Sequence, residues 1–278
     1  MIDLKDQGLL TVGGAELEYR MIGPRPGDAP TIVLLHEGLG CVGMWRDFPD
    51  RLAEATGRGV FVYSRQGYGG SSPCAVPRPL TYMHEEGREV LPLVLEAMGF
   101  QQGTLFGHSD GASIAAVYAG THEDPRVENL ILMAPHFFTE EITVASIAEA
   151  KTAYETTELR ERLKRYHGDN VDCAFWGWNG AWLDPGFLEW NLEEFLPGIR
   201  QPILALQGED DQYGTARQVE VVAEKAGGPV ELVLLPDCKH APFKEQPEAT
   251  LAAVSRFLEG PGKTLAAEPA AANIREGR

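Results

Sequence analysis

Short apolar stretches alternate with longer amphipathic stretches along this chain of 278 residues. Several of the short stretches are apolar throughout, which is typical of strands that are covered on both faces. The predicted strands are 31–36, 59–64, 103–108, 129–135, 202–208 and 230–236. Between them, apolar positions recur at helical spacing in 82–98, 215–226 and 247–258. This alternation predicts an α/β fold with a mostly parallel sheet and helices on both of its faces.

The start of the chain adds two strands to this sheet. Residues 8–12 and 15–22 flank Gly13 and Gly14, and the pair reads as a β-hairpin. The expected sheet therefore has eight strands.

One long segment interrupts the alternation. Between His136 and Pro197 the pattern indicates no strand, and a helical stretch at 146–166 is followed by an aromatic-rich one. We expect a helical cap, inserted into a core made of two separate parts of the chain. The expected divisions are 136–197 for the cap, 1–135 and 198–259 for the core, and 260–278, rich in Ala, Gly and Pro, for a flexible tail.

Charge and composition narrow the class of partner. The net charge is −17, and a strongly acidic chain lacks the basic face that nucleic acids and anionic membranes require. The N-terminus shows no secretory signal pattern, and no apolar run is long enough to span a bilayer. The four cysteines form no C-x-x-C pair, so neither a disulfide framework nor a zinc site is expected. We expect a cytoplasmic monomer or homodimer that acts on a small molecule without metal or organic cofactor.

The segment Gly107-His108-Ser109-Asp110-Gly111 joins a predicted strand to a predicted helix. A G-x-S-x-G sequence in that setting indicates a nucleophile elbow, in which glycines two residues either side of the serine permit a tight turn. The alternative is a close-packed corner with no chemical role. The strand–turn–helix context favours Ser109 as a nucleophile.

A nucleophilic serine needs a base and a carboxylate that orients it. Of the seven histidines, His240 lies in a loop between the last predicted strand and the last predicted helix, where it can reach Ser109. The others are interpreted as structural, surface or, for His136, possible substrate contacts: His36, His84, His108, His122, His136 and His167. The loop after the preceding strand offers three carboxylates, Glu209, Asp210 and Asp211. The order serine, acid, histidine is the one expected for this architecture.

Five motifs in the same order make the chain similar to the α/β-hydrolases, in particular the cap-bearing esterases and C–C bond hydrolases. They are LLHEGLGCVGMW, YSRQGYGGSS, GHSDG, QGEDD and KHAPFKEQPE, within a match of roughly residues 10–258. The resemblance implies an acid three residues after Gly208, which is Asp211 rather than Asp210. Some relatives carry the acid one strand earlier, where Glu140 or Glu141 would be the candidate.

The resemblance also implies an oxyanion hole. One donor is the backbone N–H of Asp110, and the other comes from the loop after the first parallel strand, where Gly38 is the first candidate and Leu39 the second. Relatives usually have glycine at the position of Glu37. This carboxylate is interpreted either as a loop residue turned away from the site or as a group that meets the substrate or a water molecule. In the second case its charge would oppose anionic substrates.

The expected cap holds four of the five tryptophans within residues 176–190. Most of its aromatic side chains are expected to form the small core of the cap, and a few to face a ligand cavity. The candidates for substrate binding are Glu37, Phe137, Trp176, Trp178 and Trp182.

These features predict a serine hydrolase that cleaves an ester or lactone of a small, fairly apolar or aromatic molecule. An alternative is a C–C bond hydrolase of ring-cleavage diketones, whose substrates are typically carboxylates and need a cation. Arg160, Arg162 and Arg165 lie on one helix of the expected cap. A third hypothesis is a receptor-like binding protein that keeps the triad but turns over slowly.

Overall fold

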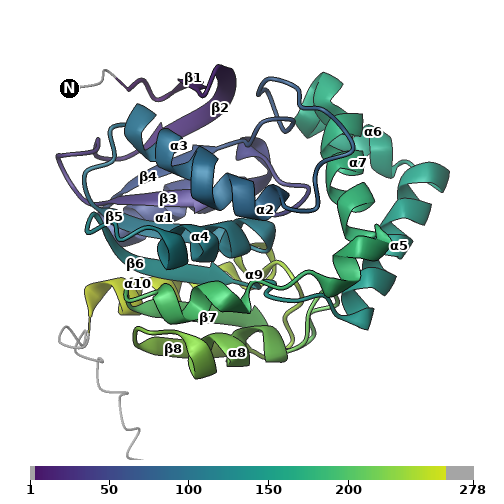
Figure 1. Ribbon diagram of the computed structural model, residues 1–278. Coiled ribbons are helices and arrows are strands. Elements are labelled where there is room, and N and C mark those ends of the chain that lie inside the picture. The colour runs from purple at the N-terminus through teal and green to yellow at the C-terminus, as the bar shows by residue number, and fades with distance from the viewer. Residues whose placement is uncertain (1–3, 261–278) are drawn as a thin grey trace, which may run out of the picture.

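The computed structural model describes residues 4–260, which form an eight-stranded sheet with helices on both faces (Figure 1). The strand order is β1-β2-β4-β3-β5-β6-β7-β8. The strands are β1 (Gln7–Val12), β2 (Ala15–Ile22), β3 (Thr31–Leu35), β4 (Gly59–Tyr63), β5 (Gly103–His108), β6 (Val127–Met133), β7 (Ile203–Gly208) and β8 (Val230–Leu235). Only β2 runs antiparallel to its neighbours β1 and β4. The predicted strands and the mostly parallel α/β fold are confirmed.

Two hydrophobic layers separate the sheet from its helices. In β3, Val33 and Leu35 face one layer, whereas Ile32 and Leu34 face the other, as the two-residue period of a strand requires. Helices α1 (Phe48–Thr56), α9 (Pro242–Glu245) and α10 (Pro247–Glu259) cover the Ile32 side. Helices α2 (Tyr82–Glu85), α3 (Leu91–Ala97), α4 (Asp110–Thr121) and α8 (Arg217–Lys225) cover the Val33 side.

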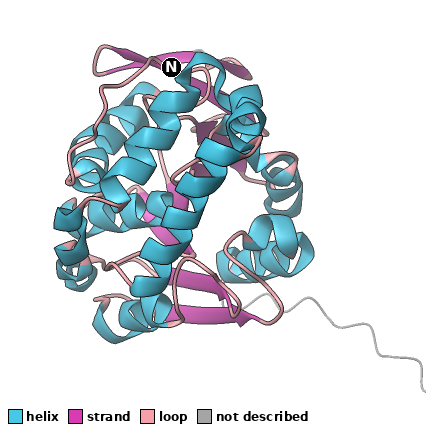
Figure 2. Cartoon of the chain, turned by 90° about the vertical axis from the view of Figure 1, so that its right-hand side faces the viewer, coloured by secondary structure: helices cyan, strands magenta, loops and turns pink. Residues whose placement is uncertain are grey.

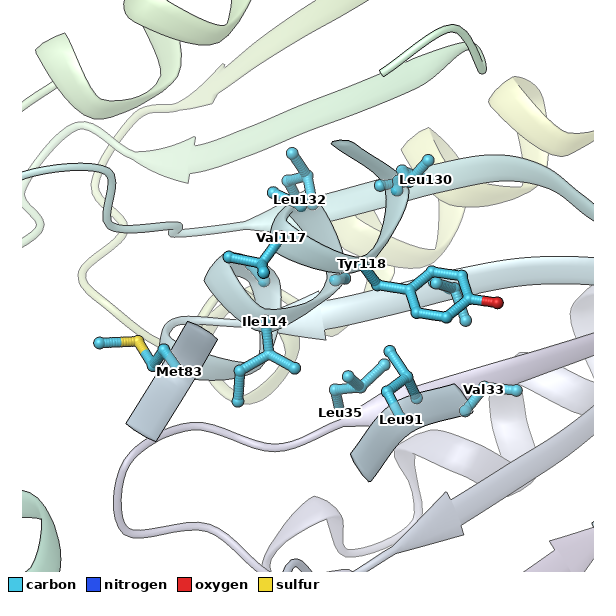
Figure 3. Packing of buried hydrophobic residues seen from close by; sticks show 14 of the residues in the cluster. Val33, Leu35, Met83, Leu91, Ile114, Val117, Tyr118, Leu130 and Leu132 are labelled. Atoms are coloured by element: carbon cyan, nitrogen blue, oxygen red, sulfur yellow. The ribbon is translucent and has the colours of Figure 1, made fainter. Parts of the chain in front are cut away.

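Helix α4 lies at the centre of the Val33 layer (Figure 3). Its residues Ala112, Ala115 and Ala116 are fully buried, and small side chains allow the helix to approach the sheet closely. Ile114 and Val117 pack beside Leu35 and Leu132 of the strands, as the close-up shows. The start of α4 is therefore held at a fixed place above β5.

The helical stretch predicted over 82–98 is not a single helix. It begins as α2, passes through a π-helical turn, η2 (Glu86–Val90), and continues as α3. Pro92 lies at the start of α3, and a proline has no N–H to donate to the preceding turn. The apolar pattern of the sequence is continuous over 82–98, because α2 and α3 bury their apolar residues in the same layer.

Three helices cover one end of the sheet: α5 (Glu141–Thr156), α6 (Leu159–His167) and α7 (Val171–Trp182). They lie at the right in Figure 1, and Figure 2 views the molecule from that side, with helices in front of the strands. Short helical turns complete the loops, namely η1 (Val42–Trp45), η3 (Gly168–Asn170), η4 (Pro185–Glu189) and η5 (Glu193–Gly198). The division into core and cap at 136 and 197 stays a prediction, and the predicted tail beyond Gly260 lies outside the described residues.

Among the helices formed by residues 4–260, none combines the length and the apolar character that crossing a membrane requires.

Gly103 at the start of β5 is a position where the packing demands glycine. Its φ is +150°, and an added Cβ would lie 1.9 Å from the carbonyl oxygen of Thr31. We expect Gly103→Ala to lower the free energy of unfolding by about 2–5 kcal/mol, because it combines backbone strain with overpacking. Gly180 in α7 is the matched control, since a Cβ there meets nothing within 4 Å.

Gly180→Ala should raise the free energy of unfolding by about 0.5–1 kcal/mol through helix propensity. Urea unfolding of both variants measures the difference. Equal stabilities for the two variants would contradict the packing argument.

Candidate active site

Ser109 lies in a sharp turn between β5 and α4. Its φ and ψ are 53° and −122°, a conformation that L-residues rarely adopt. A Cβ on Gly107 would lie 2.3 Å from the backbone N of Ala112, and one on Gly111 would lie 2.1 Å from the carbonyl oxygen of Leu35. Both flanking positions therefore exclude any side chain, and the turn has the geometry of a nucleophile elbow.

Three side chains from separate loops form a hydrogen-bonded line. The Ser109 hydroxyl lies 3.0 Å from Nε2 of His240. Nδ1 of the same ring lies 2.9 Å from both carboxylate oxygens of Asp211. Because a carboxylate only accepts hydrogen bonds, Nδ1 carries the proton and Nε2 is free to accept from the serine. This arrangement can activate the hydroxyl for attack on a carbonyl group.

Asp211 is buried and surrounded by donors. Its carboxylate accepts hydrogen bonds from the backbone N–H of Tyr213 at 2.8 Å and from the Gln207 amide at 3.2 Å. Burial acts to raise the pKa of the Asp211 carboxyl, but the charge and hydrogen bond of His240 and the Tyr213 N–H outweigh it and hold this pKa below its usual value. The carboxylate is therefore ionised when His240 acts.

The other carboxylates considered for this position do not contact His240. Asp210 is exposed, and its backbone N–H donates to the carbonyl oxygen of Cys238. Glu140 holds Thr215 and Gln218 instead. Asp210 thus bonds within the loop that carries Asp211, and Glu140 ties the start of α5 to the start of α8.

Backbone N–H groups beside Ser109 lack an acceptor in the described part of the protein. Within residues 4–260, the N–H groups of Gly38 and Asp110 donate to no protein oxygen, and both residues line the same cavity as Ser109. Leu39, the second candidate donor, shares both properties. The N-terminus of α4 carries a partial positive charge at this place. The arrangement can hold a developing oxyanion.

Hydrogen bonds of His36 and Arg65 fix the loop that carries Gly38. The backbone N–H of Arg65 donates to Nε2 of His36 at 3.0 Å, so Nδ1 of His36 carries the proton and donates to the Glu37 carbonyl at 2.7 Å. The Arg65 guanidinium donates to the carbonyl oxygens of His36 and Glu37. A Cβ on Gly38 would lie 2.1 Å from the ring of Trp178, so α7 covers this loop from above.

A cavity of about 240 Å³ opens above Ser109. Its wall combines the loops of the hydrogen-bonded line with apolar side chains of α5, α6 and α7. These apolar side chains are Ile147, Leu163, Trp178 and Trp182. Of the predicted substrate-binding residues, Glu37, Trp178 and Trp182 line this cavity.

Phe137 and Trp176 do not line it. Phe137 is fully buried in the core beneath, and its backbone N–H donates to the side-chain oxygen of Gln218. Trp176 packs at its edge against Tyr154 and Phe175 on the far side of α7. On a helix, residues 176 and 178 point about 200° apart, so the two tryptophans cannot share the cavity face.

Two further residues line this cavity. The sequence indicated His136 only as a possible substrate contact, and it gave no prediction for Tyr213. The His136 ring lies between Trp182 and His240, with centroid separations of 5.1 and 5.6 Å. The Tyr213 ring lies 4.8 Å from that of His240. Burial, together with the nearby His240, lowers the pKa of His136 to about 3, so this ring is neutral. In the sequence, only the position of Tyr213 two residues after Asp211 indicated that it would lie near the site.

Glu37 faces the cavity, and two basic side chains, His108 and Lys244, lie close to its carboxylate. Its Oε2 lies 3.5 Å from Nδ1 of His108, and its Oε1 lies 3.8 Å from the Lys244 ammonium. Burial acts to raise the pKa of Glu37, but Lys244 and His108 outweigh it and hold the pKa well below its usual value. The cavity wall formed by the described residues contains Glu37, Asp110 and Glu245 but no lysine or arginine.

Comparison with known proteins places this geometry in context. Residues 32–254 match the family model described as the alpha/beta hydrolase family. Pimeloyl-[acyl-carrier protein] methyl ester esterase of Nitrosospira multiformis is 26% identical over 83% of this chain and 95% of its own length. The enol-lactonase of Burkholderia xenovorans LB400 superposes with a TM-score of 0.70, at 24% identity, over 91% of this chain and all of that one.

A second group of relatives matches over a shorter span. Proline iminopeptidase of Lactobacillus helveticus is 30% identical over 128 residues. This alignment covers 45% of the present chain and 42% of the relative, so less than half of the peptidase is represented.

The low pKa of the buried His136 leads to a prediction for the free energy of unfolding in acid. Its pKa of about 3 in the folded protein lies below the value near 6.5 of an exposed histidine. As the pH falls from 6.5 towards 3, the unfolded chain therefore takes up a proton that the folded chain does not, and stability is lost. The loss from one such group is at most about 1.4 kcal/mol per pH unit.

We expect His136→Leu to remove this contribution, so that its free energy of unfolding falls less steeply between pH 6 and 4 than that of the wild type. Urea unfolding at several pH values measures the two slopes. Identical slopes would mean that His136 is protonated in the folded protein.

Proposed function

The chain belongs to the alpha/beta hydrolase family, and on that basis we propose that it is a serine hydrolase. Its substrate is a carboxylic ester or lactone of a small, fairly apolar or aromatic molecule, which is cleaved through an acyl-enzyme on Ser109. The observation that carries this proposal is the line from Ser109 to His240 to Asp211, at 3.0 and 2.9 Å, beside the backbone N–H groups of Gly38 and Asp110, which donate to no protein oxygen within residues 4–260.

In the first half of the reaction, Ser109 Oγ attacks the carbonyl carbon of the substrate as Nε2 of His240 takes the hydroxyl proton. Asp211 stabilises the resulting imidazolium through Nδ1–H. The carbonyl oxygen gains negative charge and accepts from the N–H groups of Gly38 and Asp110. When the tetrahedral intermediate collapses, Nε2 returns the proton to the leaving alcohol, and the acyl group stays on Oγ.

In the second half, a water molecule attacks the acyl carbon and gives its proton to Nε2 of His240. The same two N–H groups stabilise the second oxyanion. Collapse breaks the bond to Ser109 Oγ, which recovers its proton from Nε2, and the carboxylic acid leaves. The enzyme returns to its starting state without any other reactant.

The wall of the cavity supports the substrate class. Trp178 and Trp182 supply apolar and aromatic surface, and a volume of about 240 Å³ suits a small acyl or alcohol group. An anionic substrate is disfavoured, since Glu37 is ionised and the described wall offers no lysine or arginine. Relatives that include a methyl ester esterase and an enol-lactonase by name agree with ester and lactone cleavage.

The same wall weighs against the hydrolysis of ring-cleavage diketones. The substrates of that reaction are typically carboxylates, and the arginines of α6 lie away from the cavity. Arg160 is paired with Asp172, and Arg162 and Arg165 are exposed. We therefore rank this reaction below ester hydrolysis.

Removal of the nucleophile tests the mechanism. We expect Ser109→Ala to lower kcat by at least about 10³-fold on p-nitrophenyl and phenyl esters, because the hydroxyl forms the acyl-enzyme. The panel should include phenyl butyrate, the monophenyl ester of succinate, a lactone and a ring-fission diketone. Among these, the neutral phenyl ester should be cleaved faster than the anionic succinate ester.

Full turnover by Ser109→Ala would contradict the acyl-enzyme mechanism. Release of no more than one p-nitrophenol per wild-type chain would instead support a binding protein. Mass spectrometry of the wild type during p-nitrophenyl acetate turnover should show one acetyl group on the peptide that contains Ser109.

A pair of isosteric substitutions tests the acid. Asp211→Asn should lower kcat by about 10³–10⁴-fold, because an amide cannot hold His240 in the required tautomer. Asp210→Asn is the matched control and should stay within about threefold of wild type, since this neighbour is exposed. Steady-state kinetics on one good ester measures both, and a larger loss in Asp210→Asn would exclude Asp211 as the acid.

A further inference from the structure

The main chain around His240 is held by side chains that the proposed mechanism does not use. His240 lies between β8 and α9, in a loop without regular secondary structure. The backbone N–H groups on either side of it, those of Lys239 and Ala241, donate to the two carboxylate oxygens of Glu245 at 2.8 and 3.1 Å. The carbonyl oxygen of His240 itself lies 2.7 Å from Nε2 of His108. Three consecutive residues of the loop are thus anchored.

The contact with His108 fixes the state of that ring. A carbonyl oxygen can only accept, so Nε2 of His108 carries a proton and donates it. Burial lowers the pKa of His108, although the Glu37 carboxylate acts in the opposite direction. The other nitrogen of His108 faces Glu37. The ring is fully enclosed, which leaves it little freedom to turn.

Packing restricts His108 to this role. Its ring makes edge contacts with Trp45 and Phe243, at centroid separations of 6.3 and 5.4 Å, and lies 5.1 Å from the ring of His240. Because His108 precedes Ser109 in the elbow, it joins the strand that carries the nucleophile to the loop that carries the base. The bond from Nε2 therefore sets the distance between two separate parts of the site.

The chemistry explains why such an anchor matters. The imidazole of His240 must accept a proton from Ser109 and pass it to the leaving alcohol, and its charge changes at each step. Asp211 restrains the side chain at Nδ1 only, whereas the position of the ring also depends on its backbone. A displacement of about 1 Å in a reacting group can cost about 10²-fold in rate.

We propose that His108 and Glu245 are positioning residues that hold the peptide of His240, so that Nε2 remains within hydrogen-bonding distance of Ser109 throughout the reaction. This inference rests on the proposed serine hydrolase function. His108 acts through the carbonyl oxygen of His240, and Glu245 acts through the two flanking N–H groups. Neither residue exchanges a proton with the substrate.

Kinetics separates positioning from substrate binding. His108→Phe and Glu245→Ala should lower kcat by about 10–100-fold and leave KM within about threefold, because they displace the base and not the substrate. His108→Gln should recover most of the activity, since its side-chain amide can donate from a place close to that of Nε2. Glu248→Gln is the matched control, because Glu248 is a nearby exposed carboxylate paired with Arg51.

Two kinetic outcomes would overturn the proposal. One is a rise in KM with unchanged kcat in His108→Phe or Glu245→Ala, which would make these residues substrate contacts. The other is equal activity of His108→Phe and His108→Gln, which would remove the role of the donated hydrogen bond. If His108→Phe does not fold in urea-unfolding controls, Glu245→Ala and Glu245→Gln carry the test, with Glu245→Gln retaining more activity.

A spectroscopic measurement distinguishes failure of this inference from failure of the proposed function. The proton between Nδ1 of His240 and Asp211 should give a low-field proton NMR signal in the wild type that is absent in Asp211→Asn. The signal should broaden in His108→Phe and Glu245→Ala and remain sharp in His108→Gln and Glu248→Gln. This result does not depend on turnover of any ester, and an unchanged signal in both His108→Phe and Glu245→Ala would refute the positioning role.

Discussion

The close approach of α4 to β3 and β5 is the constraint on which the site depends. Gly107 and Gly111 have no room for a Cβ, because the backbones of Leu35 and Ala112 lie against them. This contact forces Ser109 into its strained turn and directs the N-terminus of α4 towards the cavity. The same contact brings the loop after β3, which carries Gly38, beside Ser109. A side chain at either glycine would move Ser109 away from the N–H groups of Gly38 and Asp110.

The rest of the site follows from the parallel sheet. Successive parallel strands end at the same edge, so the loops after β3, β5, β7 and β8 meet there although they are far apart in sequence.

Burial and neighbouring charges shift the pKa values of the groups around His240. The neighbours of Asp211 and Glu37 lower the pKa values of these carboxyl groups, whereas burial lowers the pKa values of His108 and His136.

The sequence predicted the fold well because burial on both faces leaves a strong pattern. Each predicted strand was found, and the elbow at Ser109 followed from its glycines and its place between strand and helix. The break within 82–98 was harder to foresee, since Pro92 changes the helix type without interrupting the apolar stripe. Side-chain direction was harder still. Phe137 and Trp176 are aromatic residues of the expected segment, yet their backbones turn them away from the cavity that Trp178 and Trp182 line.

By itself, the sequence determined the layers of the fold and the kinds of group available to the site, because periodicity and motif spacing are local properties. It also limited the acid to a few neighbouring carboxylates. Only the tertiary structure decided which of them reaches His240, since Asp210 and Asp211 differ by the direction of one side chain. The contact of His108 with the peptide of His240 was equally invisible, because it joins residues 132 positions apart and depends on how the loops converge at the sheet edge rather than on any local pattern.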